Sequence, residues 1–115
     1  MKQIPRGPEL DQRLRRIKHV ALDMDGTIYR GGTVFPFTTS FLAELAALGI
    51  GYSFLTNNSS KSTTDYMRHL EKIGVPATSE QVYTSTQASI EFLRETMPSA
   101  QRLFVLGTTS MRAEI

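Results

Sequence analysis

The sequence has 115 residues, of which 40% are hydrophobic and 21% charged, as is typical of a soluble globular domain. It contains no cysteine, which excludes disulfide bonds, thiol catalysis and thiolate zinc sites. The most apolar stretch, residues 41–55, is too short to cross a membrane and includes Glu44. The first residues lack the apolar core of a signal peptide, so we expect a cytoplasmic protein that binds no membrane.

The formal net charge of +2 is unevenly distributed along the chain. Residues 1–18 carry more basic than acidic side chains, and the remainder is slightly acidic. No aromatic residue is interleaved with these basic residues, so a solvent-exposed helix face explains them better than a nucleic-acid site, and we expect no nucleic-acid partner. The basic residues are Lys2, Arg6, Arg13, Arg15, Arg16 and Lys18.

The first half of the chain alternates between helix and strand patterns. Pro8 suits the first turn of a helix that runs to about residue 16, and residues 17–22 predict a strand. A glycine pair predicts a tight turn or small hairpin within residues 26–35. A helix over 37–48, a strand over 52–55 and a polar loop over 56–60 follow. The predicted core positions of that helix are Phe37, Phe41, Leu42, Leu45 and Leu48.

The second half continues the alternation. Residues 62–73 predict a helix that buries one apolar stripe, and residues 81–83 a strand. Thr84 and Gln87 have the spacing of a capping box at the start of a helix that Pro98 ends, and residues 102–106 predict another strand. Residues 111–115 carry no stop signal, so we expect a fragment that ends within a helix. The stripe consists of Tyr66, Met67, Leu70 and Ile73, and core packing is the simplest role of Phe35, Phe37, Phe41, Phe54, Phe92 and Phe104.

Strands that alternate with amphipathic helices predict an α/β fold, with a parallel sheet and right-handed crossovers. In such sheets, ligands bind at the carboxyl ends of the strands. Asp23 and Asp25, separated by one residue, follow the apolar residues 20–22 at such an end. Two ionised carboxylates this close repel each other, and a bound divalent cation or a shared proton would compensate.

The carboxylate pair has the chemistry of phosphoryl transfer. One carboxylate can attack phosphorus and form an aspartyl-phosphate that water later hydrolyses. Because the phosphoryl group and the nucleophile are both anionic, a cation such as Mg²⁺ is needed to bring them together. A second acid two residues on could protonate the leaving oxygen. Gly26 and Thr27 would turn the chain so that backbone N–H groups face the phosphoryl oxygens.

A second polar segment follows the next predicted strand. Because one helix joins the two strands, we expect them to be neighbours and Thr56 to lie beside the carboxylates. Its hydroxyl and the following N–H could donate to a phosphoryl oxygen, with the next helix N-terminus nearby. Taken alone, residues 57–60 are better explained as a helix cap. Together with the carboxylate pair, Thr56 and Asn57 favour phosphate binding.

These two segments resemble the first two signatures of the haloacid dehalogenase (HAD) superfamily. Residues 22–29 read Leu-Asp-Met-Asp-Gly-Thr-Ile-Tyr, and residues 56–62 read Thr-Asn-Asn-Ser-Ser-Lys-Ser. Both strings are similar to those of the branch that contains NagD-type and 4-nitrophenyl phosphatases, the C2-cap branch termed subfamily IIA. The resemblance covers residues 17–115.

The resemblance implies a Rossmann-like core and Mg²⁺-dependent hydrolysis of a small phosphate monoester. Asp23 would be the nucleophile and a metal ligand, and Asp25 the general acid/base, with its main chain also reaching the metal. The implied phosphate-binding residues are Met24, Gly26, Thr56 and Asn57.

The resemblance also implies parts that this sequence lacks. A later lysine and a later acidic pair complete the family's site, and Lys61 and Lys72 fall on the wrong helix to replace that lysine. The expected organisation is a basic helical extension (1–16), the first part of the core (17–83) and the start of a substrate-selecting cap (84–115).

Two alternatives remain open. The chain could be a non-catalytic module that binds a cation, phosphate or a partner chain, with uncovered edges that favour self-association into a homo-oligomer. It could also transfer the phosphoryl group to an acceptor other than water. His19 and His69 are more simply solvated or hydrogen-bonded than metal ligands.

Overall fold

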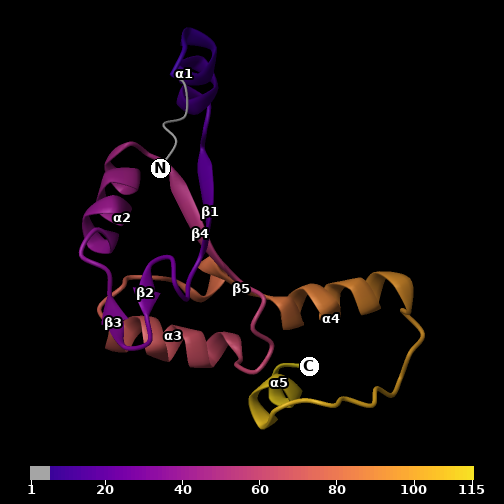
Figure 1. Ribbon diagram of the computed structural model, residues 1–115. Helices are drawn as coiled ribbons and strands as arrows, with labels where there is room; N and C mark the ends of the chain where they lie inside the picture. The colour runs from indigo at the N-terminus through magenta and orange to yellow at the C-terminus, as the bar shows by residue number, and fades with distance from the viewer. Residues whose placement is uncertain (1–5) are drawn as a thin grey trace.

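The computed structural model describes residues 6–115, which form a parallel sheet with helices around it (Figure 1). The sheet consists of β1 (His19–Asp23), β4 (Gly51–Thr56) and β5 (Val82–Thr84), in the order β1-β4-β5. Both pairings are parallel, and the register places Asp23 opposite Leu55 and Thr56 opposite Thr84. The predicted α/β class, with its parallel sheet, is confirmed.

Two helices connect the three strands. The first, α2 (Thr38–Ala47), joins β1 to β4 and buries Thr38, Leu42 and Leu45. The second, α3 (Thr63–Lys72), joins β4 to β5 and buries Tyr66 and Leu70. In Figure 1, α2 lies to the left of β1 and β4, and α3 runs below the lower end of the sheet. The core is the layer between these helices and the sheet, and it includes Met24, Ile28, Tyr29, Leu42, Leu45, Phe54, Tyr66, Leu70, Val75 and Val82.

A small hairpin separates β1 from α2, as the glycine pair predicts. It consists of β2 (Tyr29–Arg30) and β3 (Thr33–Val34), which pair antiparallel. Gly31 in the turn has a φ of 58°, a left-handed conformation that glycine adopts at little cost. The buried Thr38 hydroxyl donates to the carbonyl of Ile28 at 2.5 Å, which ties the start of α2 to the hairpin.

The remaining elements are three helices and one 3-10 turn among the described residues. The helix α1 (Pro8–Arg15) precedes the sheet and buries no residue. A 3-10 turn, η1 (Ser79–Gln81), leads into β5, and α4 (Ser85–Thr96) begins with the predicted capping box of Thr84 and Gln87. A short helix, α5 (Thr109–Glu114), follows. The predicted extension over residues 1–16 lies partly outside the described residues.

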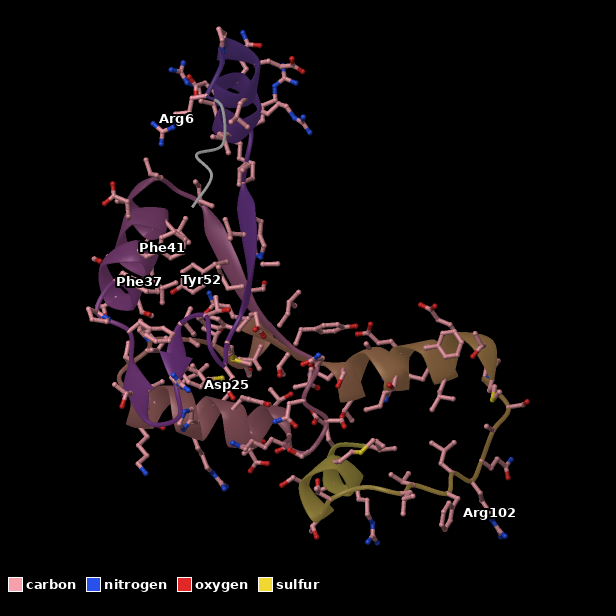
Figure 2. The ribbon with its side chains drawn as sticks, viewed as in Figure 1. Arg6, Asp25, Phe37, Phe41, Tyr52 and Arg102 are labelled. Atoms are coloured by element: carbon pink, nitrogen blue, oxygen red, sulfur yellow. The ribbon has the colours of Figure 1, made fainter. Side chains whose placement is uncertain are left out.

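The prediction of a strand over residues 102–106 is wrong. The segment has no regular secondary structure, and Phe104 and Leu106 are 95% and 89% exposed. Figure 2 shows the labelled Arg102 on this segment, far from the sheet. A strand needs a neighbour for its backbone N–H and C=O groups, and no strand within residues 6–115 pairs with this one.

Several aromatic residues predicted to pack in the core are exposed. Phe54 is fully buried, but Phe37 and Phe92 are 55% and 61% exposed. The buried stripe of α2 is narrower than predicted, because the sheet covers only the side that carries Thr38, Leu42 and Leu45. The other residues predicted as core that the structure leaves exposed are Phe41, Leu48 and Phe104. No helix within residues 6–115 has the length and apolarity needed to span a membrane.

Candidate active site

The predicted site residues meet at the carboxyl ends of β1 and β4. Asp23 is the last residue of β1, and Thr56 is the last residue of β4. The two strands are hydrogen-bonded neighbours, with Asp23 opposite Leu55 in the register. The expected proximity of Thr56 to the carboxylates is therefore confirmed at the level of strand pairing. Figure 2 shows Asp25 at this end of β1.

One cavity brings these side chains together with five further side chains that the sequence did not mark as site residues, and with the main chain of Gly31. It has a volume of about 330 Å³ and opens at the end of the sheet. Asp23 and Asp25 are exposed and line it from the β1 side, and Asn57 and the partly buried Thr56 line it from the β4 side. The other residues that line it are Tyr29, Gly31, Asn58, Lys61, Tyr66 and His69.

The backbone N–H groups of the turn after β1 are hydrogen-bonded to carbonyls within the turn. Thr27 and Ile28 both donate N–H to the carbonyl of Met24 at 3.0 Å, and Gly26 donates to the carbonyl of Tyr29 at 2.7 Å. Gly26 has a φ of 81°, which strongly favours glycine at this position. Met24 has a fully buried side chain, so only its main chain can reach a ligand. A phosphate bound by the Gly26 amide would have to replace the carbonyl of Tyr29.

The hydroxyl of Thr56 is held on two sides. The N–H of Asn58 donates to Thr56 Oγ1 at 3.1 Å, and the hydroxyl of Tyr66 lies 3.3 Å from the same atom. The Asn58 side chain in turn accepts from the N–H of Ser60 at 3.0 Å, which orders the loop before α3. Asn57 is exposed beside this loop. On the β1 side, Thr27 Oγ1 lies 3.5 Å from a carboxylate oxygen of Asp23.

Helix α3 and the loop before it supply four of these further side chains. His69 Nε2 donates to the carbonyl of Gly31 at 2.8 Å, and its ring meets that of Tyr29 edge-on at 4.7 Å. His69 is thus hydrogen-bonded, as expected, but it also lines the cavity. Lys61 lies in the loop before α3, with its ammonium 5.9 Å from the centre of the Tyr66 ring. The apolar stripe of α3 predicted Tyr66 to be a core residue. The sequence spacing of Tyr66, His69 and Lys61 gives no sign that they lie near Asp23.

Tyr29 carries a shifted pKa. Burial, and to a smaller extent the nearby Tyr66, Asp25 and Asp23, together raise the pKa of its phenol to about 12, since each disfavours the phenolate anion. Tyr29 is therefore a neutral hydroxyl at neutral pH and takes no part as a base.

The donor atoms at this site suit a magnesium ion. Mg²⁺ prefers oxygen ligands and is usually held by one or two carboxylates, with water and substrate phosphate in the other positions. Asp23 and Asp25 supply two carboxylates that open into the cavity. Within residues 6–115, no cluster of three or more His, Asp or Glu side chains could enclose a metal ion. The residues thus fit an open site whose remaining positions come from other groups.

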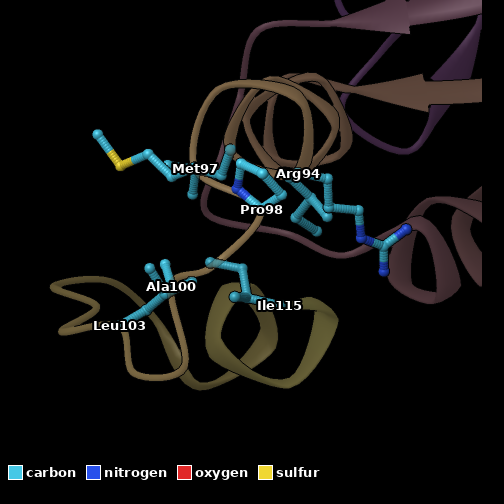
Figure 3. A pocket seen from close by; sticks show the side chains of 8 residues that line it. Arg94, Met97, Pro98, Ala100, Leu103 and Ile115 are labelled. Atoms are coloured by element: carbon cyan, nitrogen blue, oxygen red, sulfur yellow. The ribbon is translucent and has the colours of Figure 1, made fainter.

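Two further cavities differ in chemistry. One, of about 460 Å³, adjoins the first and shares Asp23, Thr56 and Asn57 with it, while Leu55 and Tyr83 form part of its wall. The other lies between α4, the segment after it and the chain end, away from the sheet (Figure 3). No Asp or Glu side chain lines this cavity. The lining residues labelled in Figure 3 are Arg94, Met97, Pro98, Ala100, Leu103 and Ile115.

The geometry agrees with what comparison with known proteins shows. Residues 20–115 match the family model described as haloacid dehalogenase-like hydrolase. The chain belongs to this family. The match begins within β1 and includes both polar segments of the site.

Among curated relatives, this hydrolase-family chain is 30% identical over 102 residues to the 5'-nucleotidase YutF of Bacillus subtilis. The match covers 89% of the chain and 40% of the relative. It is also 30% identical over 95 residues to a 4-nitrophenylphosphatase of Schizosaccharomyces pombe, covering 81% of the chain and 32% of the relative. The chain therefore spans 40% or less of the length of these two relatives.

Solved structures agree with the fold and the branch. The crystal structure of 4-nitrophenylphosphatase from Thermotoga maritima matches with a TM-score of 0.82 and 34% identity, over 87% of this chain and 38% of that one. NagD from E. coli K-12 matches with a TM-score of 0.74 and 28% identity, over 85% of this chain and 38% of that one. The predicted Rossmann-like core and the NagD and 4-nitrophenylphosphatase branch are confirmed.

Proposed function

We propose that this chain takes part in the Mg²⁺-dependent hydrolysis of a small phosphate monoester through an aspartyl-phosphate. One observation carries the proposal: Asp23, Asp25 and Thr56 line a single cavity at the carboxyl ends of two adjacent parallel strands. The relatives named as phosphatases and a nucleotidase support phosphate esters as the substrate class.

In the proposed reaction, a carboxylate oxygen of Asp23 attacks phosphorus, and the bond between phosphorus and the leaving oxygen breaks. Asp25 gives its proton to that oxygen, so an alcohol departs. Asp25 then takes a proton from a water molecule that attacks the phosphorus. Inorganic phosphate leaves, and the carboxylate of Asp23 is restored. The spacing of the two residues places both at one end of β1.

The groups that hold the phosphate and the metal follow from the same cavity. Asp23 would hold Mg²⁺ through its carboxylate and Asp25 through its main-chain carbonyl, and the ion when bound would neutralise charge between the phosphoryl group and its nucleophile. Thr56 would donate its hydroxyl to a phosphoryl oxygen, with Asn57 beside it. Met24 and Gly26 would contribute main-chain groups from the turn. As a domain assignment, we propose an extension over 1–16, a core over 17–83 and the start of a cap from 84.

The substitution Asp23→Asn tests the nucleophile. An amide is a poor nucleophile and a poor metal ligand, so we expect turnover of the protein to fall by at least about a thousandfold. Intact-mass spectrometry of the chain after incubation with acetyl phosphate and Mg²⁺ should detect one phosphoryl group, lost on hydroxylamine treatment. The adduct should be absent from Asp23→Asn and should persist longer in Asp25→Asn. An adduct of equal yield in Asp23→Asn would contradict the mechanism.

The same experiment separates the alternatives. Among the residues that the structure describes, no group of three His, Asp or Glu side chains is placed to hold a metal ion, and this favours a non-catalytic module as the second candidate. That candidate predicts phosphate or Mg²⁺ binding by calorimetry without any adduct. A phosphotransferase predicts the adduct, with faster loss when an alcohol acceptor is added than in water alone.

A further inference from the structure

The hydroxyl of Thr56 has limited hydrogen-bonding capacity. A hydroxyl carries one hydrogen and two lone pairs. The N–H of Asn58 uses one lone pair, at 3.1 Å, and the hydroxyl of Tyr66 lies 3.3 Å away at a second position. If Thr56 donates to Tyr66, no hydrogen is left for a ligand. If Tyr66 donates to Thr56, the hydrogen of Thr56 is free to point into the cavity.

The ring of Tyr66 has a second neighbour on the cavity. Lys61 lines the same cavity as Asp23 and Asp25, and its ammonium lies 5.9 Å from the centre of the ring. A cation within about 6 Å of an aromatic ring is attracted to its face. The ring itself is 4% exposed and fixed in the core of α3 against the sheet. A long lysine side chain that rests on a fixed ring loses fewer rotamers when it binds a ligand.

A positive side chain in this cavity would offset the negative charge of the two carboxylates. Two carboxylates repel a phosphate dianion, and a positive side chain at the same cavity offsets part of that repulsion. Lys61 is the lysine that the structure places there, although its position before α3 differs from that of the family's later lysine.

We propose that Tyr66 is a positioning residue that prepares two donors for phosphate: its hydroxyl orients the hydroxyl of Thr56, and its ring holds the ammonium of Lys61. This inference rests on the proposed function, because it takes the cavity as the phosphate site. It adds Lys61 to the phosphate-binding residues. The two roles of Tyr66 are separable, since phenylalanine keeps the ring and loses the hydroxyl, whereas leucine loses both.

Calorimetric titration of the chain with inorganic phosphate in Mg²⁺ buffer tests the proposal. We expect Tyr66→Phe to weaken binding about fivefold through the lost hydrogen bond. Lys61→Met should weaken it about fivefold through the lost charge, and Lys61→Arg should restore most of the affinity. Tyr52→Phe is the matched control, because the Tyr52 hydroxyl lies 3.5 Å from the carbonyl of Pro76 and does not line the cavity. It should bind phosphate as the wild type does.

A double-mutant cycle separates positioning from general stability. Lys61→Met should cost the same affinity in the Tyr66→Phe background as in the wild type, because the ring remains. In the Tyr66→Leu background it should cost almost nothing, because the ammonium is no longer held. Thermal unfolding of each variant checks the fold. If Tyr66→Leu does not fold, comparison of Tyr66→Phe with Tyr52→Phe tests the role of the Tyr66 hydroxyl. The salt dependence of phosphate binding in Lys61→Met then tests the role of the Lys61 charge.

The outcomes distinguish this inference from the proposed function. Wild-type affinity in Tyr66→Phe, together with an equal cost of Lys61→Met in every background, would overturn the inference and leave the phosphate site intact. A folded wild-type chain that binds no phosphate would overturn the phosphate site itself, and this inference with it.

Discussion

Tyr29 combines burial with proximity to both carboxylates. Its phenol is 4% exposed, and burial raises its pKa from 10.0 to about 12. The folded chain therefore favours the neutral phenol more than the unfolded chain does. This contribution to stability is complete below about pH 10 and is lost as the pH rises through about 12.

The substitution Tyr29→Phe should remove this alkaline dependence, because phenylalanine has no proton to lose. We expect the free energy of unfolding of the wild type to fall between about pH 10 and pH 12, and that of Tyr29→Phe to fall less. Urea unfolding at a series of pH values measures the difference. Parallel curves for the two proteins over this range would show that Tyr29 does not carry the effect.

Single residues could be assigned to the site from the sequence where a strand end dictates their position. Asp23 and Thr56 end adjacent parallel strands, so topology alone predicts that they meet. Tyr66 and Lys61 reach the same cavity from the following helix and its leading loop. Helical periodicity marked Tyr66 as core, which it is, but cannot indicate which atom its hydroxyl meets.

At the scale of elements, α3 shows how local sequence fixes a helix start. The side chain of Ser62 accepts from the N–H of Asp65 at 3.2 Å, and the carboxylate of Asp65 accepts from the N–H of Ser62 at 2.9 Å. These bonds form a capping box. Ser62 also ends the loop that contains Asn58, whose N–H donates to Thr56 Oγ1. The helix cap and the candidate phosphate-binding loop therefore belong to the same segment.

The substitution Ser62→Ala should cost about 1 kcal/mol of unfolding free energy, because the first turn of α3 loses a side-chain acceptor. The hydrogen bond from the Ser62 backbone, with one from the Ser110 side chain, lowers the pKa of Asp65 below 3.8, so stability from this group is present above that pH and lost on further acidification. Denaturant unfolding at neutral pH measures the first effect. Ser59→Ala, at an exposed loop position, is the control and should leave stability unchanged.

Elements with local signals were predicted well, and the element without a local partner was not. The apolar stripe of α3 and the capping box of α4 each lie within a few residues of sequence, and both helices start close to where they were predicted. Residues 102–106 have the composition of a strand, but strand formation depends on a neighbour elsewhere in the chain. Without one in the described residues, the segment has no regular secondary structure and is mostly exposed.

The molecule as a whole is elongated. Its radius of gyration is 17.4 Å, against about 13 Å for a compact domain of this length. The arm formed by α4, the following segment and α5 extends from the sheet (Figure 1). It exposes large apolar side chains, with Phe104 at 95% and Leu106 at 89%. Exposed apolar surface of this kind favours self-association.

We therefore expect the chain to associate as its concentration rises, and the double substitution Phe104→Lys with Leu106→Lys to reduce that association. Sedimentation velocity over a concentration series measures both. Arg102→Ala, at an exposed position of the same segment, is the control and should associate as the wild type does. Identical sedimentation of the wild type and the double variant would show that this segment is not responsible.

The sequence by itself determined the α/β class, the adjacency of β1 and β4, the capped start of α4 and the pair of strand-end motifs. These depend on short-range periodicity, capping chemistry and the geometry of parallel crossovers, all of which are encoded within one or two elements. Only the tertiary structure decided that Tyr66 and Lys61 join Thr56 at the cavity, that Phe37 and Phe41 are exposed and that residues 102–106 form no strand. The physical reason is that each of these outcomes depends on which surface lies opposite a side chain, and that surface comes from a distant part of the chain.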